Sequence, residues 1–368
     1  MGMDRAGLTF ASLMTLGPDL AVSTARTAAE LGYRSFWTAE TTGPEAFSLL
    51  GAVGTAAPGL DLGTGVLALQ LRTPMVVAMA GATLQALAPE RDVLLGVGIS
   101  SPVVTERWHG VPYGDRPLEQ VREYVTLLRA CLSGEKVDFA GDFYQVKGFR
   151  LGVRPRGPGP SGRGSGKRVP KIVVGALNPA MLRLAGELAD GVLLNYLPAS
   201  HVPWSVEQVR NGGAARAAAG AGETSRAAAG AGATARAAAG VEGTCAIYAY
   251  VHAGVCARDD GIDLARRDLC SYAVVDSYAR NFERAGFVEE VAEIRERFAA
   301  GDREGALGAV SDRMVDAIDA MGDADAVHAT MQSYVDAGVE VPVLMPLPWG
   351  RDRRASADAT IRAAIGKG

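Results

Sequence analysis

The chain has 368 residues, of which 48% are hydrophobic, and this is enough to bury the core of one large domain. Its formal net charge is -4 and it has no sustained basic helix, so composition gives no electrostatic reason to expect nucleic-acid binding. No basic segment followed by an apolar core opens the chain and no apolar run has the length of a membrane span, so we expect a cytoplasmic protein that does not bind membranes.

Apolar segments that favour strands alternate along the chain with segments that favour helices. The predicted strands are residues 8–13, 35–39, 60–66, 93–99, 171–175, 191–196, 245–252 and 339–344. Eight such units in one α/β chain predict a parallel (β/α)8 TIM barrel, which we expect to form a single domain over 1–368. An open doubly wound sheet is the alternative, but residues 96–101 lack the third glycine of the dinucleotide-binding fingerprint.

Helix start and stop signals support this alternation. Pro18 is expected to open the first helix and Gly32 to end it, and Pro44 is expected to open the second. Asn178 followed by Pro179 predicts an N-cap with proline at the first helical position.

Residues 60–74 form the predicted third strand and the loop that follows it. Apolar residues alternate around Gly63 and Gly65, and the segment then ends in a polar turn with Pro74. Glycine inside a strand marks a bulge or the close approach of another backbone or a flat ligand. The segment is therefore predicted to open into an active site.

Two segments interrupt the pattern, and we interpret both as insertions. Residues 150–168 combine basic side chains with proline and glycine, which predicts a mobile loop before the fifth strand. An alternative is that its basic residues attract an anionic cofactor tail or substrate. Residues 211–243 contain a ten-residue repeat that begins at Arg216, Arg226 and Arg236. Alanine favours helix whereas the glycine pairs interrupt it, so this segment is predicted to be an expanded surface loop without catalytic residues.

Neither a metal site nor a disulfide framework is expected. The four cysteines are widely spaced without a C-x-x-C pair, and the four histidines are equally scattered.

Two turns are predicted to bind an anion. Residues 175–179 run from the fifth strand into a helix whose first N–H groups point back to the barrel mouth, and residues 197–200 repeat this arrangement after the sixth strand. Helix N-termini bind anions. An ordinary capping role for Asn178 and Ser200 is the alternative.

Several motifs together resemble the bacterial luciferase-like superfamily and, more narrowly, its coenzyme F420-dependent oxidoreductases. They lie in nearly all parts of the chain outside the two insertions, at residues 36–40, 44–50, 62–66, 72–74, 95–98, 108–113, 139–144 and 185–191. This resemblance implies a TIM barrel with a deazaflavin or flavin at the carboxyl ends of its strands. The implied cofactor is coenzyme F420, with FMN as the alternative.

The resemblance also implies which residues contact the cofactor. A bulge with a non-prolyl cis peptide backs the ring in the deazaflavin members, and Thr64, Gly65 and Val66 occupy that place here. Around the exit of the fourth strand, the ring would have room beside Gly96 and Gly98 and a hydrogen bond from Ser100. Close packing alone would also explain these glycines. The cofactor phosphate would be bound by Gly175, Ala176, Asn178, Leu197 and Ser200.

Two residues are candidates for catalysis. Many deazaflavin members have an acid followed by histidine after the second strand, whereas this chain has Glu40 followed by Thr41. Glu40 is predicted to bind the ring or to act as an acid, and His109 to donate a proton to the substrate. Structural roles are the alternatives for both. His252 and His201 are weaker candidates, and His328 is expected to face solvent.

The leading hypothesis for function is hydride transfer between the deazaflavin and a small organic substrate. An FMN-dependent monooxygenase that uses oxygen is the second hypothesis, and a non-catalytic ligand-binding barrel is the third. Residues 280–321 are predicted to cover the barrel mouth and to set specificity. A homodimer is a further implication of the resemblance.

Overall fold

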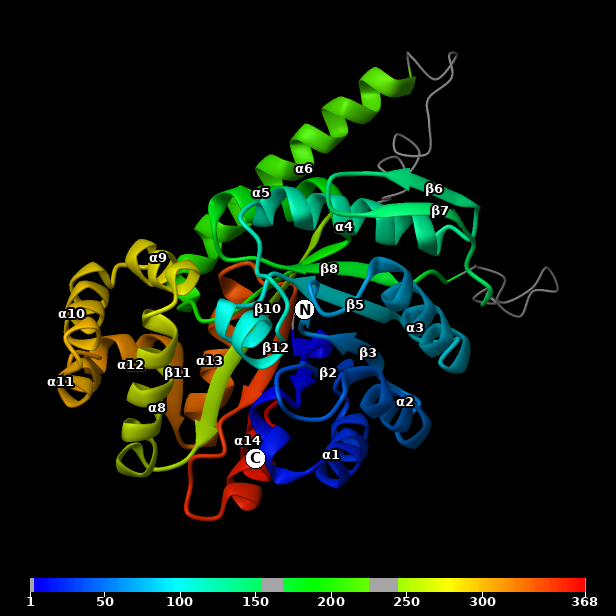
Figure 1. Ribbon diagram of the computed structural model, residues 1–368. Coiled ribbons are helices and arrows are strands. Elements are labelled where there is room, and N and C mark those ends of the chain that lie inside the picture. The colour runs from blue at the N-terminus through cyan, green and yellow to red at the C-terminus, as the bar shows by residue number, and fades with distance from the viewer. Residues whose placement is uncertain (1–2, 154–167, 225–243, 368) are drawn as a thin grey trace.

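The computed structural model describes residues 3–153, 168–224 and 244–367, and its centre is a closed barrel of parallel strands (Figure 1). Each strand pairs with its two neighbours, and the last pairs with the first. This confirms the predicted (β/α)8 TIM barrel. In order around the barrel the strands are β1 (Gly7–Thr9), β2 (Ser35–Thr38), β3 (Asp61–Thr64), β5 (Val93–Gly98), β8 (Lys171–Gly175), β9 (Gly191–Leu194), β10 (Ala246–Val255) and β12 (Val341–Pro346).

Side chains that alternate along the strands divide the core into two layers. One set fills the barrel interior around Trp37, Tyr248 and Tyr250. The other set packs against the surrounding helices. These helices are α1 (Pro18–Leu31), α2 (Ala46–Ala56), α3 (Pro74–Leu87), α4 (Pro117–Leu132), α5 (Pro179–Leu188), α6 (Val202–Thr224), α13 (Ala324–Asp336) and α14 (Arg353–Ala363).

A second group of helices lies on one side of the barrel, at the left of Figure 1. It has its own buried cluster, which includes Phe282 and Met314 and also Tyr196 from the barrel. The helices are α8 (Arg258–Ala273), α9 (Asp276–Arg284), α10 (Val288–Ala299), α11 (Arg303–Gly308) and α12 (Asp312–Ile318). This group supplies most of the segment that was predicted to cover the barrel mouth.

Some smaller elements were not predicted from the sequence. Strand β11 (Asp319–Gly322) pairs with the second half of β10, and β4 (Leu67–Ala68) pairs with β5. Strands β6 (Val137–Ala140) and β7 (Gln145–Phe149) form an antiparallel hairpin. Four short helices complete the described chain, namely η1 (Met3–Arg5), η2 (Ala11–Leu16), the π-helix η3 (Val103–Trp108) and η4 (Ala199–His201).

Helix boundaries confirm part of the predicted pattern and correct part of it. Helix α1 begins at Pro18 and ends at Gly32, which has a φ of 91°. The prediction that Pro44 opens the second helix is wrong, because α2 begins at Ala46. Glu45 is its N-cap, and its carboxylate accepts hydrogen bonds from the N–H groups of Phe47 and Ser48. The first predicted strand is also too long, since η2 begins at Ala11.

The prediction of a surface loop over residues 211–243 is wrong for its first part. Helix α6 continues to Thr224 and projects away from the barrel in Figure 1. Glycines on both helices allow α5 and α6 to pack closely. A Cβ on Gly212 of α6 would lie 1.9 Å from the carbonyl oxygen of Arg183 in α5, and a Cβ on Gly186 of α5 would lie 2.0 Å from the carbonyl oxygen of Val209 in α6. Close packing therefore compensates for the low helix propensity of glycine. Residues 225–243 lie outside the described residues.

Most of the other predicted insertion, residues 154–167, also lies outside the described part of the chain. Strand β8 begins at Lys171 as predicted. Just before it, Arg168 forms an ion pair with Asp92.

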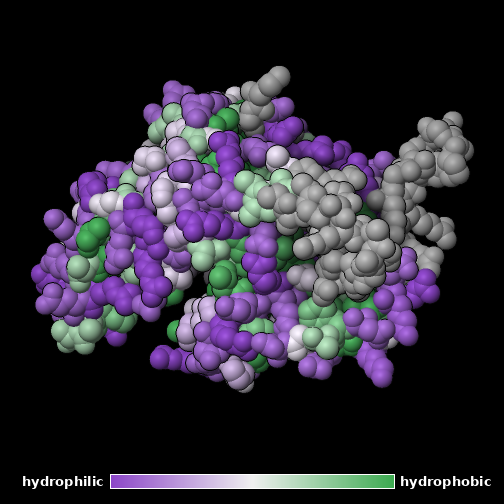
Figure 2. Space-filling model, turned by 90° about the horizontal axis from the view of Figure 1, so that it is seen from above, coloured by the Kyte–Doolittle hydropathy of each residue, from purple (hydrophilic) through white to green (hydrophobic). Residues whose placement is uncertain are grey.

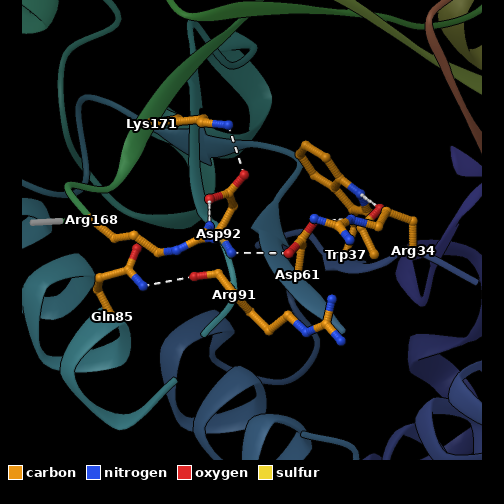
Figure 3. Close-up of polar contacts among 9 residues, drawn as sticks. Arg34, Trp37, Asp61, Gln85, Arg91, Asp92, Arg168 and Lys171 are labelled. Atoms are coloured by element: carbon orange, nitrogen blue, oxygen red, sulfur yellow. Dashed lines mark hydrogen bonds and ion pairs between the residues drawn. The ribbon is translucent and has the colours of Figure 1, made fainter. Parts of the chain in front are cut away.

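Charged side chains stabilise the amino-terminal end of the barrel (Figure 3). The Asp61 carboxylate accepts from Arg34 Nε at 2.7 Å and from the backbone N–H of Asp92 at 2.9 Å. The Asp92 carboxylate in turn binds Lys171 at 2.7 Å and Arg168. In TIM barrels this end serves stability, and the active site lies at the opposite end.

Polar side chains cover most of the face in Figure 2, and apolar side chains are visible in its middle and in smaller groups toward its lower right and its left edge. Within the described residues, no helix combines the length and the apolar character needed to cross a membrane.

Candidate active site

Strand β3 ends in a bulge at the carboxyl end of the barrel. The peptide between Gly65 and Val66 is cis, as the resemblance implied. The Gly65 N–H donates to the carbonyl oxygen of Thr38 at 2.7 Å, and the hydroxyl of Tyr250 donates to that of Gly65 at 2.8 Å. The hydroxyl of Thr64, the last residue of β3, donates to the carbonyl oxygen of Gly96 in β5 at 2.9 Å. The bulge is therefore held by the neighbouring strands β2 and β5 and, across the barrel, by β10.

The glycines of β5 and β8 accommodate this bulge. A Cβ on Gly96 would lie 1.8 Å from the Thr64 carbonyl oxygen, and one on Gly98 would lie 2.9 Å from a methyl group of Val66. A Cβ on Gly175 would lie 3.3 Å from a methyl group of Val66, so the Val66 side chain also fills the space beside Gly175. The expectation that Gly96 and Gly98 leave room directly for a ring is therefore corrected: the space belongs to Val66.

Ser100 follows β5 and is half-buried. The structure gives its hydroxyl no hydrogen bond to any described residue, so it remains able to bind a ligand.

Glu40 lies after β2 and is tightly bound within the protein. Its carboxylate accepts two hydrogen bonds from Arg72, at 2.6 and 2.9 Å, and one from the N–H of Ala46 at 3.1 Å. Arg72 also pairs with Glu45 and lies over the ring of Phe47. Glu40 thus joins the loop after β2 to the loop that leads into α3, and both of its carboxylate oxygens have hydrogen-bond partners within the protein.

His109 ends the short helix η3 and is exposed to solvent. Its ring has no hydrogen bond or ion pair with any residue in the described ranges. The structure therefore leaves the predicted proton-donor role of His109 without a supporting contact.

The first predicted anion-binding turn lies where β8 leads into α5. Gly175 ends the strand, and Ala176 is buried with its N–H bonded to the carbonyl oxygen of Leu193 at 3.2 Å. Asn178 is at the N-cap position, but its side chain makes no cap hydrogen bond. It instead donates to the carbonyl oxygen of Ser277 and accepts from Arg284 at 2.8 Å. The capping alternative is therefore wrong for its side chain, and the end of the helix stays open to an anion.

Arg284 adds positive charge to this turn. Burial and the neighbouring charge of Arg280 lower the pKa of Arg284, and its guanidinium lies over the ring of Trp204. Its only hydrogen bond within the described residues is the one to the neutral Asn178. An anionic ligand group would compensate the charge of Arg284.

The second predicted anion-binding turn has fewer groups available to bind an anion. Leu197 is buried and its carbonyl oxygen accepts from the Tyr334 hydroxyl at 2.6 Å. Ser200 is exposed in η4 and does not cap the helix through its side chain. Next to it, His201 is buried and stacks on Trp204.

Buried polar atoms without a partner mark the same end of the barrel. They include the hydroxyl of Thr38, the last residue of β2, as well as Gln70 Oε1 after β4 and His201 Nε2 after β9, for which the described residues provide no hydrogen bond. Burying such groups unpaired is costly, so these atoms fit a ligand with polar edges.

A buried hydrogen-bonded group joins the residue after β9 to the second half of β10. His252 Nε2 is 2.9 Å from Asn195 Oδ1, and its Nδ1 is 3.1 Å from Asp319 Oδ1. The ring of Tyr196 packs edge-on against His252, and its hydroxyl donates to Asp268 at 2.7 Å. Burial, followed by the charge of Asp319, raises the pKa of Asp268 to about 6.

Sequence reasoning missed several of these residues and named His252 only as a weaker candidate. Tyr248 and Tyr250 alternate with His252 along β10, so strand periodicity could have placed both on the same inward face. Asn195 and Asp319 carried no such signal, because only the fold brings them to His252.

No group of three or more potential metal-binding side chains occurs within the part of the chain that the structure describes.

Comparison with known proteins identifies the family. The model of the luciferase-like monooxygenase family matches residues 9–340. The chain belongs to this family.

Two relatives align with most of this chain. A Mycobacterium tuberculosis protein named as a coenzyme F420-dependent oxidoreductase is 28% identical, over 86% of this chain and 88% of its own. The 5,10-methylenetetrahydromethanopterin reductase of Archaeoglobus fulgidus is 30% identical, over 84% and 83%.

Among solved structures, the coenzyme F420-dependent tetrahydromethanopterin reductase from Methanopyrus kandleri superposes with a TM-score of 0.73. It covers 99% of this luciferase-like chain and 97% of its own, at 20% identity. The likeness supports the barrel fold.

Proposed function

We propose that this luciferase-like protein is a coenzyme F420-dependent oxidoreductase that transfers a hydride between the deazaflavin and a small organic substrate. The observation that carries the proposal is the Gly65–Val66 bulge, held at the carboxyl end of the barrel by Thr38 and Tyr250. The relatives named as F420-dependent enzymes support the choice of cofactor.

The residues around the bulge fit a planar ring. Val66 presents an apolar side chain whose inner side is packed against Gly96 and Gly98. The unpartnered Thr38 hydroxyl and Gln70 Oε1 lie after the neighbouring strands and could bind polar groups on the ring edge. Ser100 has a free hydroxyl at the same end.

The turn at the start of α5 fits the anionic part of the cofactor. The N–H groups of Ala180 and Met181 have no side-chain cap, so they can bind an anion. Arg284 adds a positive charge beside them, and burial and the charge of Arg280 lower the pKa of its guanidinium. We assign Gly175, Ala176 and Asn178 to this anion-binding site. Leu197 and Ser200, from the turn after β9, are assigned to its other side.

When bound, the deazaflavin supplies the two-electron chemistry, and the protein supplies binding and orientation. Arg72 binds Glu40 and thereby holds the loop after β2 against the loop that leads into α3. His109 stays a candidate for contact with the substrate.

Equilibrium titration with F420 and with FMN tests the proposal, followed through tryptophan fluorescence and cofactor absorbance. We expect selective binding of F420. Arg284→Met should weaken it at least about tenfold, because a charge-assisted hydrogen bond contributes about 1.5 kcal/mol or more. Arg362→Met is the matched control, since this exposed arginine of α14 pairs only with Asp358 among the described residues.

An FMN-dependent monooxygenase is the second candidate, and the description of the family itself favours it. Selective FMN binding with oxygen consumption would replace the first proposal. Binding of neither cofactor would favour a non-catalytic barrel. The homodimer and the cytoplasmic location stay predictions.

A further inference from the structure

Helices α2 and α3 differ in composition from the other long helices. The 11 residues of α2 and the 14 residues of α3 contain no Asp, Glu, Lys or Arg, although charged residues make up 21% of the chain. All the other described helices of comparable length carry charged side chains. The two helices pack side by side at the right of Figure 1, so their outer sides form one uncharged surface, which we call the α2–α3 face.

Helix α3 contributes large apolar side chains to this face. Val76, Met79 and Leu87 are 45%, 52% and 72% exposed, and their spacing places them on one side of the helix together with the exposed Thr83. Single exposed apolar residues are ordinary on a protein surface, whereas a contiguous group of them marks an interaction site.

Helix α2 contributes small side chains. Ser48, Ala52 and Thr55 are exposed at helical spacing, and Gly51 lies beside them. A Cβ on Gly51 would have no other atom within 4 Å, so the surface of α2 is open there. A second helix can approach closely where the side chains are small. The large side chains of α3 and the shallow surface of α2 are therefore complementary in shape.

Charged residues lie at the edges of the face. Arg72, just before α3, pairs with the N-cap Glu45 of α2 at 2.5 Å, and Glu90 and Arg91 follow the other end of α3. An apolar centre with a polar rim is the usual anatomy of a protein–protein interface. The face itself has no Lys or Arg that would attract anionic lipid headgroups.

Absence of charge and complementary shape both fit contact between identical surfaces. In a two-fold symmetric dimer each copy uses the same surface, so a charge near the axis would meet its own copy. We propose that the α2–α3 face binds a second copy of this chain, with the Met79 side chain of α3 packed on α2 near Gly51 of the partner subunit. This inference concerns assembly and does not depend on the proposed F420-dependent function.

Sedimentation velocity across a dilution series of the full chain tests the proposal. We expect a wild-type dimer, and Met79→Glu should raise its Kd at least about 100-fold, because each dimer would bury two unpaired carboxylates. Leu264→Glu is the matched control, since Leu264 is also an exposed apolar residue of a helix, at 40%, but lies on α8. It should leave the Kd unchanged. A wild type that is monomeric throughout the series would overturn the proposal.

Gly51→Leu tests the predicted shape complementarity. The folded chain has space for the new side chain, and leucine favours helix more than glycine does, so the monomer should remain as stable as the wild-type chain. The same side chain would occupy the space that Met79 of the partner subunit needs, so the Kd should rise at least about tenfold. Gly308→Leu is the matched control, because a Cβ on Gly308 of α11 would also have no other atom within 4 Å.

Thermal unfolding provides a second readout and separates misfolding from dissociation. The Tm of the wild type should rise with protein concentration, because association stabilises the folded chain by mass action. Met79→Glu should unfold cooperatively with a Tm that does not depend on concentration. A dimer that persists in both Met79→Glu and Gly51→Leu would mean that another surface forms the contact, and the proposal would be wrong. None of these measurements uses a cofactor, so failure of F420 binding would overturn the proposed function alone.

Discussion

The hydroxyl of Tyr250 donates a 2.8 Å hydrogen bond to the carbonyl oxygen of Gly65, across the barrel interior. These residues are far apart in the sequence, and the contact joins β10 to the bulge after β3. A Cβ on Gly65 would lie 2.0 Å from the same hydroxyl, so glycine is needed for this approach. The relationship explains how a short loop segment is held in place at the candidate active site.

Tyr250→Phe should therefore destabilise the protein and weaken F420 binding. It leaves the buried Gly65 carbonyl without its partner, which costs about 1–3 kcal/mol. Urea unfolding and F420 titration measure the two effects. Tyr248→Phe is the matched control, since Tyr248 lies on the same face of β10 without a hydrogen bond to a described residue. Equal effects of both substitutions would contradict the role of the Tyr250 hydroxyl.

Gly212 and Gly213 should respond in opposite directions to alanine. A Cβ on Gly212 would meet backbone of α5 at 1.9 Å, whereas the nearest atom to one on Gly213 is 3.8 Å away. We expect Gly212→Ala to destabilise the protein by about 1–3 kcal/mol through overpacking. Gly213→Ala should stabilise it by up to about 1 kcal/mol, because alanine favours helix. Urea unfolding tests both, and equal values would mean that α5 and α6 do not pack this closely.

Glu45 should stabilise the folded state at neutral pH. Burial acts to raise the pKa of its carboxyl group, but hydrogen bonds from Ser48 and Phe47 and the charge of Arg72 lower it to about 2, from an ordinary value of 4.5. A lowered pKa gives stability that is present above 4.5 and is lost as the pH falls toward 2. The deficit of Glu45→Gln in thermal unfolding should thus shrink as the pH falls through this range.

Glu119→Gln is the control for Glu45, because Glu119 is also an exposed acid near a helix N-terminus but makes no hydrogen bond or ion pair with a described residue, whereas Glu45 caps its helix and pairs with Arg72. A Glu45→Gln deficit that is independent of pH would rule out the carboxylate as its cause.

Asp268 should show the opposite dependence on pH. Its pKa is raised by burial and by Asp319 from 3.8 to about 6, so the folded state binds the proton more tightly than the unfolded state. The resulting stability is full below 3.8 and is lost as the pH rises through about 6. Asp268→Asn should flatten the dependence of the free energy of unfolding on pH in this window. Asp358→Asn, at an exposed ion pair of α14, should leave it unchanged.

The barrel was predictable from the sequence because its signals are local. The apolar strands, Pro18 at the start of α1 and Gly32 at its end reflect interactions within a few residues. The glycines of the third strand indicated a bulge or a close approach, whereas the cis peptide at Gly65–Val66 was predicted only through a family resemblance. The first part of residues 211–243 was wrongly predicted as a loop because Gly212, just before the repeat, lies where α5 and α6 touch, and local helix propensity does not include that contact.

For the site, the sequence by itself determined the fold class, the family and the carboxyl-terminal location, since each follows from periodicity or from motifs along the chain. Only the tertiary structure decided the partners: Arg72 for Glu40, Arg284 for Asn178, and Asn195 and Asp319 for His252. These side chains come from different strands, helices and loops. Their chemistry depends on burial and on hydrogen bonds that exist only after the barrel and the α8–α12 group pack together.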